Sequence, residues 1–208
     1  MPKVYTGDLT KMFDIYGKKA MIFVGAGGFG EAIAAGYAAN GCSVCISSRS
    51  EEKLQAAKAK IEAAAAPGVK VMYIAGDAGD EEFVKKAVEV VTGPEGLGGC
   101  DILVNAQGIN KKMWSWEIDT DFFEKMLHTN ITSLMLTCKY FGNWMKSNNV
   151  EGAEKIGEAD FEHGKCNPNQ GYGKIINFGS VRGIRVVANG GNGNVPYNTT
   201  KGAVEMLT

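Results

Sequence analysis

Two side chains near the end of the sequence have the types and spacing of an acid–base pair. Tyr197 and Lys201 are four residues apart, and Pro196 suits the first turn of a helix, so both side chains fall on one helical face. A phenol that titrates near pH ~10 is a poor acid or base at neutral pH. A neighbouring ammonium favours the phenolate and lowers that pKa. Taken alone, the Tyr-x-x-x-Lys pattern also fits an ordinary helix face.

A hydroxyl and an amide accompany this pair. Ser180 follows a strand predicted at 174–178, and in a parallel sheet the carboxyl ends of the strands form the ligand crevice. A serine in a plain turn is the alternative. Asn130 lies on the apolar stripe of a helix predicted over 119–144, so we expect a buried, hydrogen-bonded amide. One alternative is that Asn130 forms a structural hydrogen bond to a neighbouring strand end. The other is that it anchors a water or proton relay, and its position in the sequence does not separate the two.

A glycine-rich turn near the amino end has the pattern that binds dinucleotides. An apolar run over 21–24 predicts a buried strand, and an alanine-rich segment over 30–40 predicts a helix. Between them, Gly25, Gly27 and Gly30 form G-x-G-x-x-G in the strand–turn–helix setting that this fingerprint requires. Such glycines allow a tight turn, close approach of a pyrophosphate, and close packing of helix on strand.

The start of the predicted helix is the expected phosphate site. Its first N–H groups are free and the helix dipole is positive there. We expect the pyrophosphate on the N–H groups of Phe29 and Gly30, with Gly28 part of the same turn. This turn is therefore the candidate cradle for the cofactor.

The residues after the second predicted strand, 43–47, indicate which dinucleotide is bound. An acid at this point would bind the ribose 2′-hydroxyl of NAD, whereas an arginine accepts the 2′-phosphate of NADP. The sequence has Ser48 and Arg49 here, and no acid before Glu51. Because arginine forms bidentate phosphate contacts, this segment favours NADP over NAD. A solvated arginine before a helix is the alternative.

Strands and helices alternate along the chain. The predicted strands cover 21–24, 43–47, 69–75, 101–105 and 174–178, and the predicted helices cover 30–40, 50–66, 77–91, 119–144 and a segment from 196 onward. This order predicts an α/β fold, a Rossmann-type doubly wound parallel sheet with helices on both faces. We expect a single domain over 1–208 with an irregular arm at 1–18. An insertion at 147–173 is either a surface loop or a lid or interface loop.

Composition excludes several classes of protein. The chain has 208 residues, 45% of them hydrophobic, and a net charge of −1. It therefore lacks the positive electrostatic field that attracts nucleic acid. No apolar run is long enough for a membrane span, and no signal peptide is recognisable, which predicts a cytoplasmic protein. Cys42 and Cys45 form C-x-x-C on a predicted strand, where they point to opposite faces. We therefore expect two buried thiols and no metal.

The joint pattern resembles the short-chain dehydrogenase/reductase family from about residue 13 to 208. The resemblance implies that Tyr197 is the general acid/base and that Ser180 binds the reacting oxygen. It implies that Lys201 holds the nicotinamide ribose and lowers the tyrosine pKa, while Asn130 anchors a water chain. The implied activity is an NAD(P)-dependent oxidoreductase interconverting a secondary alcohol and a ketone.

Further cofactor contacts follow from the same resemblance. Asp77 would meet the adenine, and Asn105 would support the fourth strand beside the cofactor. Gln107 and Gly108 belong to the same motif and count among the cofactor-binding residues. The partners implied are a small carbonyl or hydroxyl substrate and further copies of the chain, as a homodimer or homotetramer.

The sequence also departs from the family pattern. The glycine turn is one residue shorter and lacks the usual threonine, and Asn105-Ala106-Gln107-Gly108 stands in place of Asn-Asn-Ala-Gly. The sequence stops at Thr208 within an apolar helix, so we expect a C-terminally truncated chain without the usual last strands. These features support an alternative, a catalytically silent dinucleotide-binding protein or assembly partner.

Overall fold

The computed structural model describes residues 14–112, 115–148, 173–185 and 194–208. Its strands are β1 (Lys19–Phe23), β2 (Ser43–Ser48), β3 (Val71–Ala75), β4 (Ile102–Asn105) and β5 (Lys174–Asn177). Its helices are α1 (Gly28–Ala39), α2 (Glu51–Ala64), α3 (Glu81–Thr92), the 3₁₀ turn η2 (Ser115–Glu117), α4 (Thr120–Leu127), the π-helix η3 (His128–Thr132), α5 (Ser133–Asn148), α7 (Val181–Ile184) and α8 (Val195–Leu207).

The five described strands form one parallel sheet in the order β3-β2-β1-β4-β5. The order reverses at β1, because the chain first winds outward through β2 and β3 and then crosses to β4. Such a reversal opens a crevice at the carboxyl ends of the strands. The predicted doubly wound parallel sheet is confirmed.

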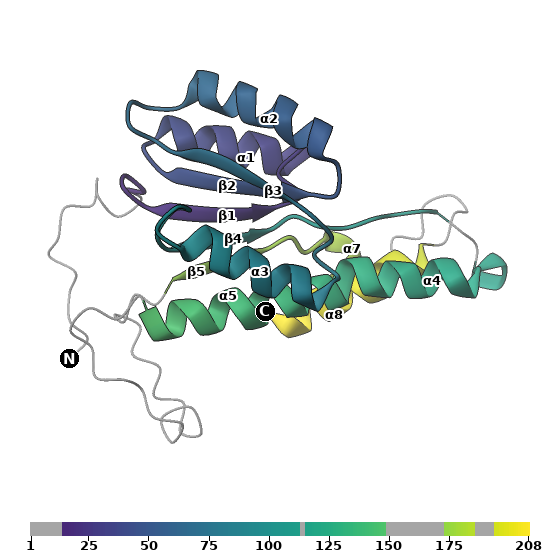
Figure 1. Ribbon diagram of the computed structural model, residues 1–208. Coiled ribbons are helices and arrows are strands. Elements are labelled where there is room, and N and C mark those ends of the chain that lie inside the picture. The colour runs from purple at the N-terminus through teal and green to yellow at the C-terminus, as the bar shows by residue number, and fades with distance from the viewer. Residues whose placement is uncertain (1–13, 113–114, 149–172, 186–193) are drawn as a thin grey trace, which may run out of the picture.

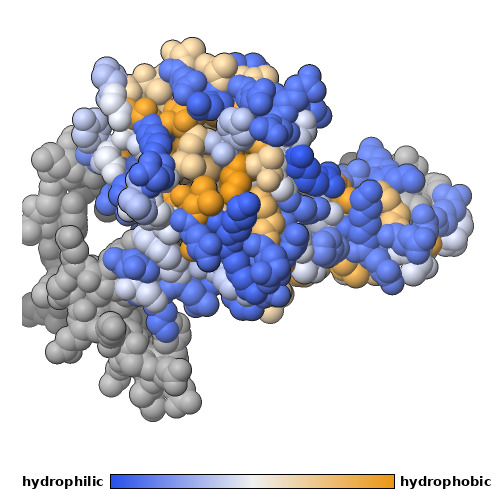
Figure 2. All heavy atoms as spheres, in the orientation of Figure 1, coloured by the Kyte–Doolittle hydropathy of each residue, from blue (hydrophilic) through white to orange (hydrophobic). Residues whose placement is uncertain are grey.

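Helices cover both faces of the sheet (Figure 1). On one face, α1 and α2 pack Ala34, Ala38 and Leu54 onto the sheet within the first hydrophobic cluster. On the other face, α3 and α5 contribute Ala87 and Phe141 to a second cluster. In Figure 2, hydrophobic side chains gather where the sheet lies, between α2 above and α3 below. The two cores fix the strands, and the strands fix the loops at their carboxyl ends.

Side-chain caps define the starts of several helices. Ser50, Asp80 and Asp119 accept hydrogen bonds from backbone N–H groups in the first turns of α2, α3 and α4, respectively. By contrast, α1 begins at Gly28, and its N-cap residue Gly27 provides no side-chain hydrogen bond. No capping side chain therefore occupies the N–H groups of the first turn of α1.

The structure corrects the predicted bounds of several elements. The first strand covers 19–23 rather than 21–24, and Val24 lies in the turn with φ 62°. The helix predicted over 119–144 is two α-helices joined by a π-helix and extends to Asn148, so the insertion cannot begin at 147. The short helix α7 was not predicted. Most of the predicted arm and insertion falls outside the described residues.

Candidate active site

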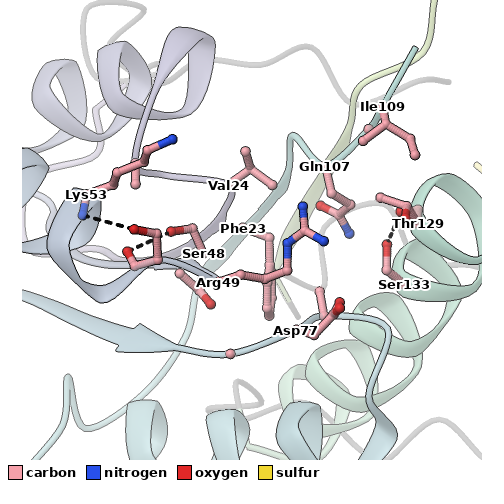
Figure 3. A pocket seen from close by; sticks show the side chains of 16 residues that line it. Phe23, Val24, Ser48, Arg49, Lys53, Asp77, Gln107, Ile109, Thr129 and Ser133 are labelled. Carbon is pink, nitrogen blue, oxygen red and sulfur yellow. Dashed lines mark hydrogen bonds between the residues drawn. The ribbon is translucent and has the colours of Figure 1, made fainter. Parts of the chain in front are cut away.

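A cavity of about 280 Å³ lies at the carboxyl edge of the sheet (Figure 3). Its volume is near the lower end of small-molecule pockets, roughly 300–1,000 Å³. The ends of the four strands β1 to β4 and the start of α5 contribute its walls: Phe23, Val24, Ala26, Ser47, Ser48, Arg49, Ser50, Lys53, Gly76, Asp77, Ala78, Gln107, Gly108, Ile109, Thr129 and Ser133. The cavity therefore occupies the crevice expected at the topological switch point.

The wall from β2 and α2 carries positive charge. The Arg49 side chain extends from the end of β2 into the cavity, and Lys53 from the first turn of α2 also lines it (Figure 3). Ser48 Oγ donates to the Ser50 carbonyl at 3.4 Å. Beside Arg49 (Figure 3), Asp77 is exposed and accepts the Gly79 N–H at 2.9 Å through its Oδ1. Two positively charged side chains and one carboxylate thus line the cavity.

Two buried polar atoms in the cavity wall lack a hydrogen-bond partner. Gln107 is 5% exposed and Ser47 is 1% exposed, yet Gln107 Oε1 and Ser47 Oγ are unpaired. The other end of the glutamine is held, because its Nε2 donates to Asn105 Oδ1 at 3.4 Å and to Thr137 Oγ1 at 3.5 Å. Buried polar groups normally find a partner. A bound polar ligand would supply one here.

The glycines of the turn divide into two groups. A Cβ at Gly25 would lie 2.5 Å from Ile46 Cβ, and a Cβ at Gly30 would lie 2.2 Å from the Val24 carbonyl oxygen. These two glycines are required for packing of the helix and the turn on the strands. A Cβ at Gly27 or Gly28 would meet nothing within 4 Å. Their backbone faces open space, as a phosphate cradle requires.

The turn also carries backbone strain. Val24 has φ 62°, and a β-branched residue in this left-handed region is a genuine outlier. Such strain tends to occur at ligand-binding and catalytic sites. The shortened turn that the sequence indicates thus coincides with a strained residue in the cavity wall.

Asn130 lies in the π-helix η3 and is 1% exposed. Its Oδ1 accepts the Ile109 N–H at 2.8 Å, and its Nδ2 donates to the Ile109 carbonyl and to Thr200 Oγ1, both at 3.0 Å. Thr200 Oγ1 in turn donates to the Tyr197 carbonyl at 2.9 Å. The amide thus connects the segment after β4 to helix α8, in a π-helix of the kind that often marks functional sites.

The Tyr197 and Lys201 side chains meet on α8. The Lys201 ammonium lies 5.8 Å from the centroid of the half-buried Tyr197 ring and donates to the Phe178 carbonyl. Lys201 is 5% exposed, and burial lowers its pKa, while the Glu205 carboxylate acts in the opposite direction. A Cβ at Gly108 would lie 3.7 Å from Lys201 Nζ, so the ammonium borders the loop that lines the cavity.

Ser180 lies between β5 and the short helix α7, which packs on α8. It starts α7, and its Oγ accepts the Arg182 N–H at 3.2 Å. Helix α7 packs on α8 so closely that a Cβ at Gly183 would lie 2.6 Å from the Lys201 carbonyl carbon. The segment of Ser180 is therefore fixed against the turn of α8 that carries Lys201.

Asn105 does not line the cavity. It is 1% exposed, and its Nδ2 donates to Asn177 Oδ1 at 2.9 Å and to Cys138 Sγ at 3.3 Å. Its Oδ1 accepts from Thr137 Oγ1 at 2.9 Å. The side chain thus joins the ends of β4 and β5 to α5 and supports the loop that carries Gln107.

Sequence reasoning missed several residues that the structure brings to the site. Ser47, Lys53, Thr129 and Ser133 line the cavity, and Thr200 links Asn130 to α8. Lys53 had a signal in the sequence, because it lies in the first turn of the helix that follows Arg49. Thr129 and Ser133 had none; Thr129 lies in the π-helix η3 and Ser133 at the start of α5.

Two of the cysteines, Cys42 and Cys45, do not line the cavity. Cys42 and Cys45 are buried free thiols in hydrophobic clusters on opposite faces of the sheet, which confirms the prediction of two buried thiols. Burial raises the pKa of Cys42 to about 12 and also raises that of Cys45. Within the described ranges, no three His, Cys, Asp or Glu side chains gather to hold a metal ion. None of the helices described has the length and apolar character needed to cross a membrane.

Comparison with known sequences gives a consistent family assignment. General stress protein 39 of Bacillus subtilis (strain 168) is 31% identical over 80% of this chain and 54% of its own length. Carbonyl reductase family member 4 of Danio rerio is 30% identical over 91% of this chain and 65% of its own length. The chain therefore spans less than two thirds of either relative.

Solved structures agree with the sequence comparison. A short chain dehydrogenase from Burkholderia cenocepacia J2315, solved in complex with NADP, superposes with a TM-score of 0.71 at 28% identity, over 94% of this chain and 67% of that one. The family profile described as short chain dehydrogenase matches residues 18–154. With this match, the parallel sheet and the relatives, the chain belongs to the short-chain dehydrogenase/reductase family of oxidoreductases.

Proposed function

We propose that this chain carries the cofactor site and the acid–base pair of an NAD(P)-dependent oxidoreductase that interconverts a secondary alcohol and a ketone. The observation that carries the proposal is the pairing of Tyr197 with a buried Lys201 ammonium, at the border of the cavity. When bound, the nicotinamide would donate or accept the hydride. The protein supplies binding, orientation and proton transfer.

The cavity and the turn fit a dinucleotide. The uncapped start of α1 offers N–H groups to a pyrophosphate, and Gly27 and Gly28 leave the space for it. Gln107 Oε1 and Ser47 Oγ are acceptors without partners, and ribose hydroxyls are donors that suit them. Asp77 would contact the adenine end, because it lies on the wall formed by β3.

The charge of the cavity favours NADP over NAD. Arg49 and Lys53 both line the wall at the end of β2, where a 2′-phosphate would lie. An arginine forms bidentate contacts with phosphate, and a lysine adds a second positive charge. The structural relative from Burkholderia cenocepacia was solved with NADP, which supports the same cofactor class here.

The roles that we propose for the acid–base residues are those that the family resemblance implies. Tyr197 would give a proton to the carbonyl oxygen in reduction and take it back in oxidation. Ser180 would donate a hydrogen bond to the same oxygen as negative charge develops there. Lys201 is held by the Phe178 carbonyl and would bind the nicotinamide ribose, while Asn130 fixes the turn of α8 through Thr200.

The test separates binding from chemistry. The parent chain and the Tyr197→Phe variant are titrated with NADPH by calorimetry, and both are assayed for oxidation of NADPH with a panel of ketones. We expect equal NADPH affinity and turnover in the parent alone. If both bind NADPH and neither converts any substrate, the catalytic proposal fails and the silent-binder alternative stands.

A further inference from the structure

A glutamate lies on the face of α8 that carries the acid–base pair. Tyr197, Lys201 and Glu205 follow one another at intervals of four residues within α8, so their side chains project from one side of the helix. The Glu205 side chain reaches the segment between β5 and α7, because a Cβ at Gly179 would lie 2.1 Å from Glu205 Oε1. The carboxylate therefore occupies the side-chain space that Gly179 leaves open.

The Lys201 ammonium is buried and donates to a neutral acceptor. Lys201 is 5% exposed, and its hydrogen bond goes to the Phe178 carbonyl. A buried charge is costly unless an opposite charge accompanies it, and a carbonyl supplies none. The Glu205 carboxylate attracts the ammonium and raises the pKa of Lys201, whereas burial lowers it. Because Phe178 precedes Gly179, one short segment provides the hydrogen-bond acceptor and also the place where the carboxylate lies.

Other charged groups lie on the elements packed against α8. Among α7, η3 and α4, the charged or titratable side chains are Arg182, His128, Asp121, Glu124 and Lys125. The segment 178–180 carries no charged side chain. The pKa of Lys201 responds to burial and to Glu205. Glu205 is thus the charged partner of Lys201 among these groups.

We propose that Glu205 is a positioning residue of the acid–base site, whose carboxylate, lying against Gly179, provides the counter-charge for the buried Lys201 ammonium. The inference rests on the proposed function, because it assumes that Lys201 and Tyr197 act on a bound cofactor and substrate. A lysine assists a neighbouring phenol only while its ammonium is protonated. Glu205 keeps Lys201 protonated, and its effect on the reaction passes through Lys201.

The first measurement is the free energy of unfolding in urea, from neutral pH up to the ordinary lysine pKa of 10.5. Without the counter-charge, folded Lys201 loses its proton at a lower pH. Glu205→Gln should therefore lose most stability near neutral pH, and the loss should shrink as pH rises and Lys201 becomes neutral. In a Lys201→Met background, the effect of Glu205→Gln should not depend on pH. Parallel pH profiles of parent and Glu205→Gln would overturn the inference. The matched control is Glu89→Gln, which removes an exposed carboxylate from α3 and should follow the parent's profile.

A second variant tests the place of the carboxylate without removing it. In Gly179→Ala the new methyl group would displace the end of the Glu205 side chain, which is free to rotate away. This variant should reproduce the pH dependence of Glu205→Gln, and combining the two should add no further pH-dependent loss. Gly36→Ala, whose Cβ would meet nothing within 4 Å, is the control for a glycine substitution. Additive pH-dependent losses would overturn the placement of the carboxylate at Gly179.

The last measurement concerns the reaction. With NADPH and a ketone that the parent reduces, Glu205→Gln should lower kcat at neutral pH about two- to fivefold, the factor that corresponds to an exposed ion pair, and leave the KM of the ketone unchanged. An unchanged kcat would overturn the positioning role. A parent that reduces no ketone would overturn the proposed function instead, and the urea profiles would still decide whether Glu205 is the counter-charge of Lys201.

Discussion

Alanine at two glycines of the same turn should separate folding from cofactor binding. A Cβ at Gly30 would lie 2.2 Å from the Val24 carbonyl oxygen and 2.9 Å from its carbonyl carbon, where real Cβ contacts stay beyond 3.0 Å. Both atoms belong to the backbone, so no side chain can rotate away. Helix α1 would have to move off the turn by close to an ångström.

The expected cost for Gly30→Ala is about 3 kcal/mol, the upper end of the range for overpacking. The gain in helix propensity from alanine, about 1 kcal/mol, offsets only part of this. For a chain of this size, Tm falls by roughly 2–4 °C per kcal/mol. NADPH affinity should fall as well, because the displaced helix start carries the phosphate-binding N–H groups.

Gly27→Ala should behave differently. A Cβ at Gly27 meets nothing within 4 Å, and its backbone, with φ 160°, is extended, so alanine fits. The loss of stability should stay within about 1 kcal/mol, the cost of a poorer helix N-cap. The methyl group would nevertheless fill the space in front of the turn, and NADPH affinity should fall at least about tenfold.

Urea unfolding followed by circular dichroism gives the free energies of unfolding, and calorimetric titration with NADPH gives the affinities. We expect Gly30→Ala to lose both stability and NADPH affinity, and Gly27→Ala to lose affinity alone. A Gly27→Ala variant with full NADPH affinity, or one as unstable as Gly30→Ala, would contradict this expectation.

Three further predictions concern the cavity wall and helix α8. Arg49→Gln should weaken NADPH binding by about 10- to 100-fold and leave NADH binding unchanged, because only NADPH carries the 2′-phosphate that the guanidinium would pair with. Equal losses of affinity in calorimetric titrations with NADPH and NADH would contradict this. Thr200→Val should lower the free energy of unfolding by about 1–3 kcal/mol, since the buried Asn130 amide loses one of its hydrogen-bond partners. Thr200→Ser keeps the hydroxyl and should be closer to the parent in urea unfolding. Because burial lowers the pKa of Lys201 below its ordinary 10.5, the unfolded chain binds the extra proton between the two values, and stability should rise with pH there. The Lys201→Met variant should lack that part of the rise in the free energy of unfolding. Identical dependence of stability on pH in the variant and the parent would exclude this role of Lys201.

The topology was readable from the sequence because each strand is a short apolar run that a glycine or a helix start terminates. The parallel order then follows from alternation, and the crevice follows from the parallel order. Arg49 was predicted at the cofactor site by the same logic, since it comes directly after a strand end, and it lines the cavity. Asp77, which also lines the cavity, was predicted from the family resemblance.

The π-helix could not be predicted in this way. Periodicity around Asn130 is that of an α-helix, and its hydrogen bonds to Ile109 and Thr200 join it to segments far away in the sequence. The contact of Phe29 with Phe178 likewise joins segments far apart in the sequence. Such features arise from tertiary packing, which the composition of the chain and the spacing of its residues do not predict.

The most direct test of the central claim is a crystal structure of the chain with bound NADP⁺. We predict the pyrophosphate on the N–H groups of Phe29 and Gly30, and the 2′-phosphate against Arg49 and Lys53. A complex with its phosphates elsewhere on the protein would contradict the account of this site.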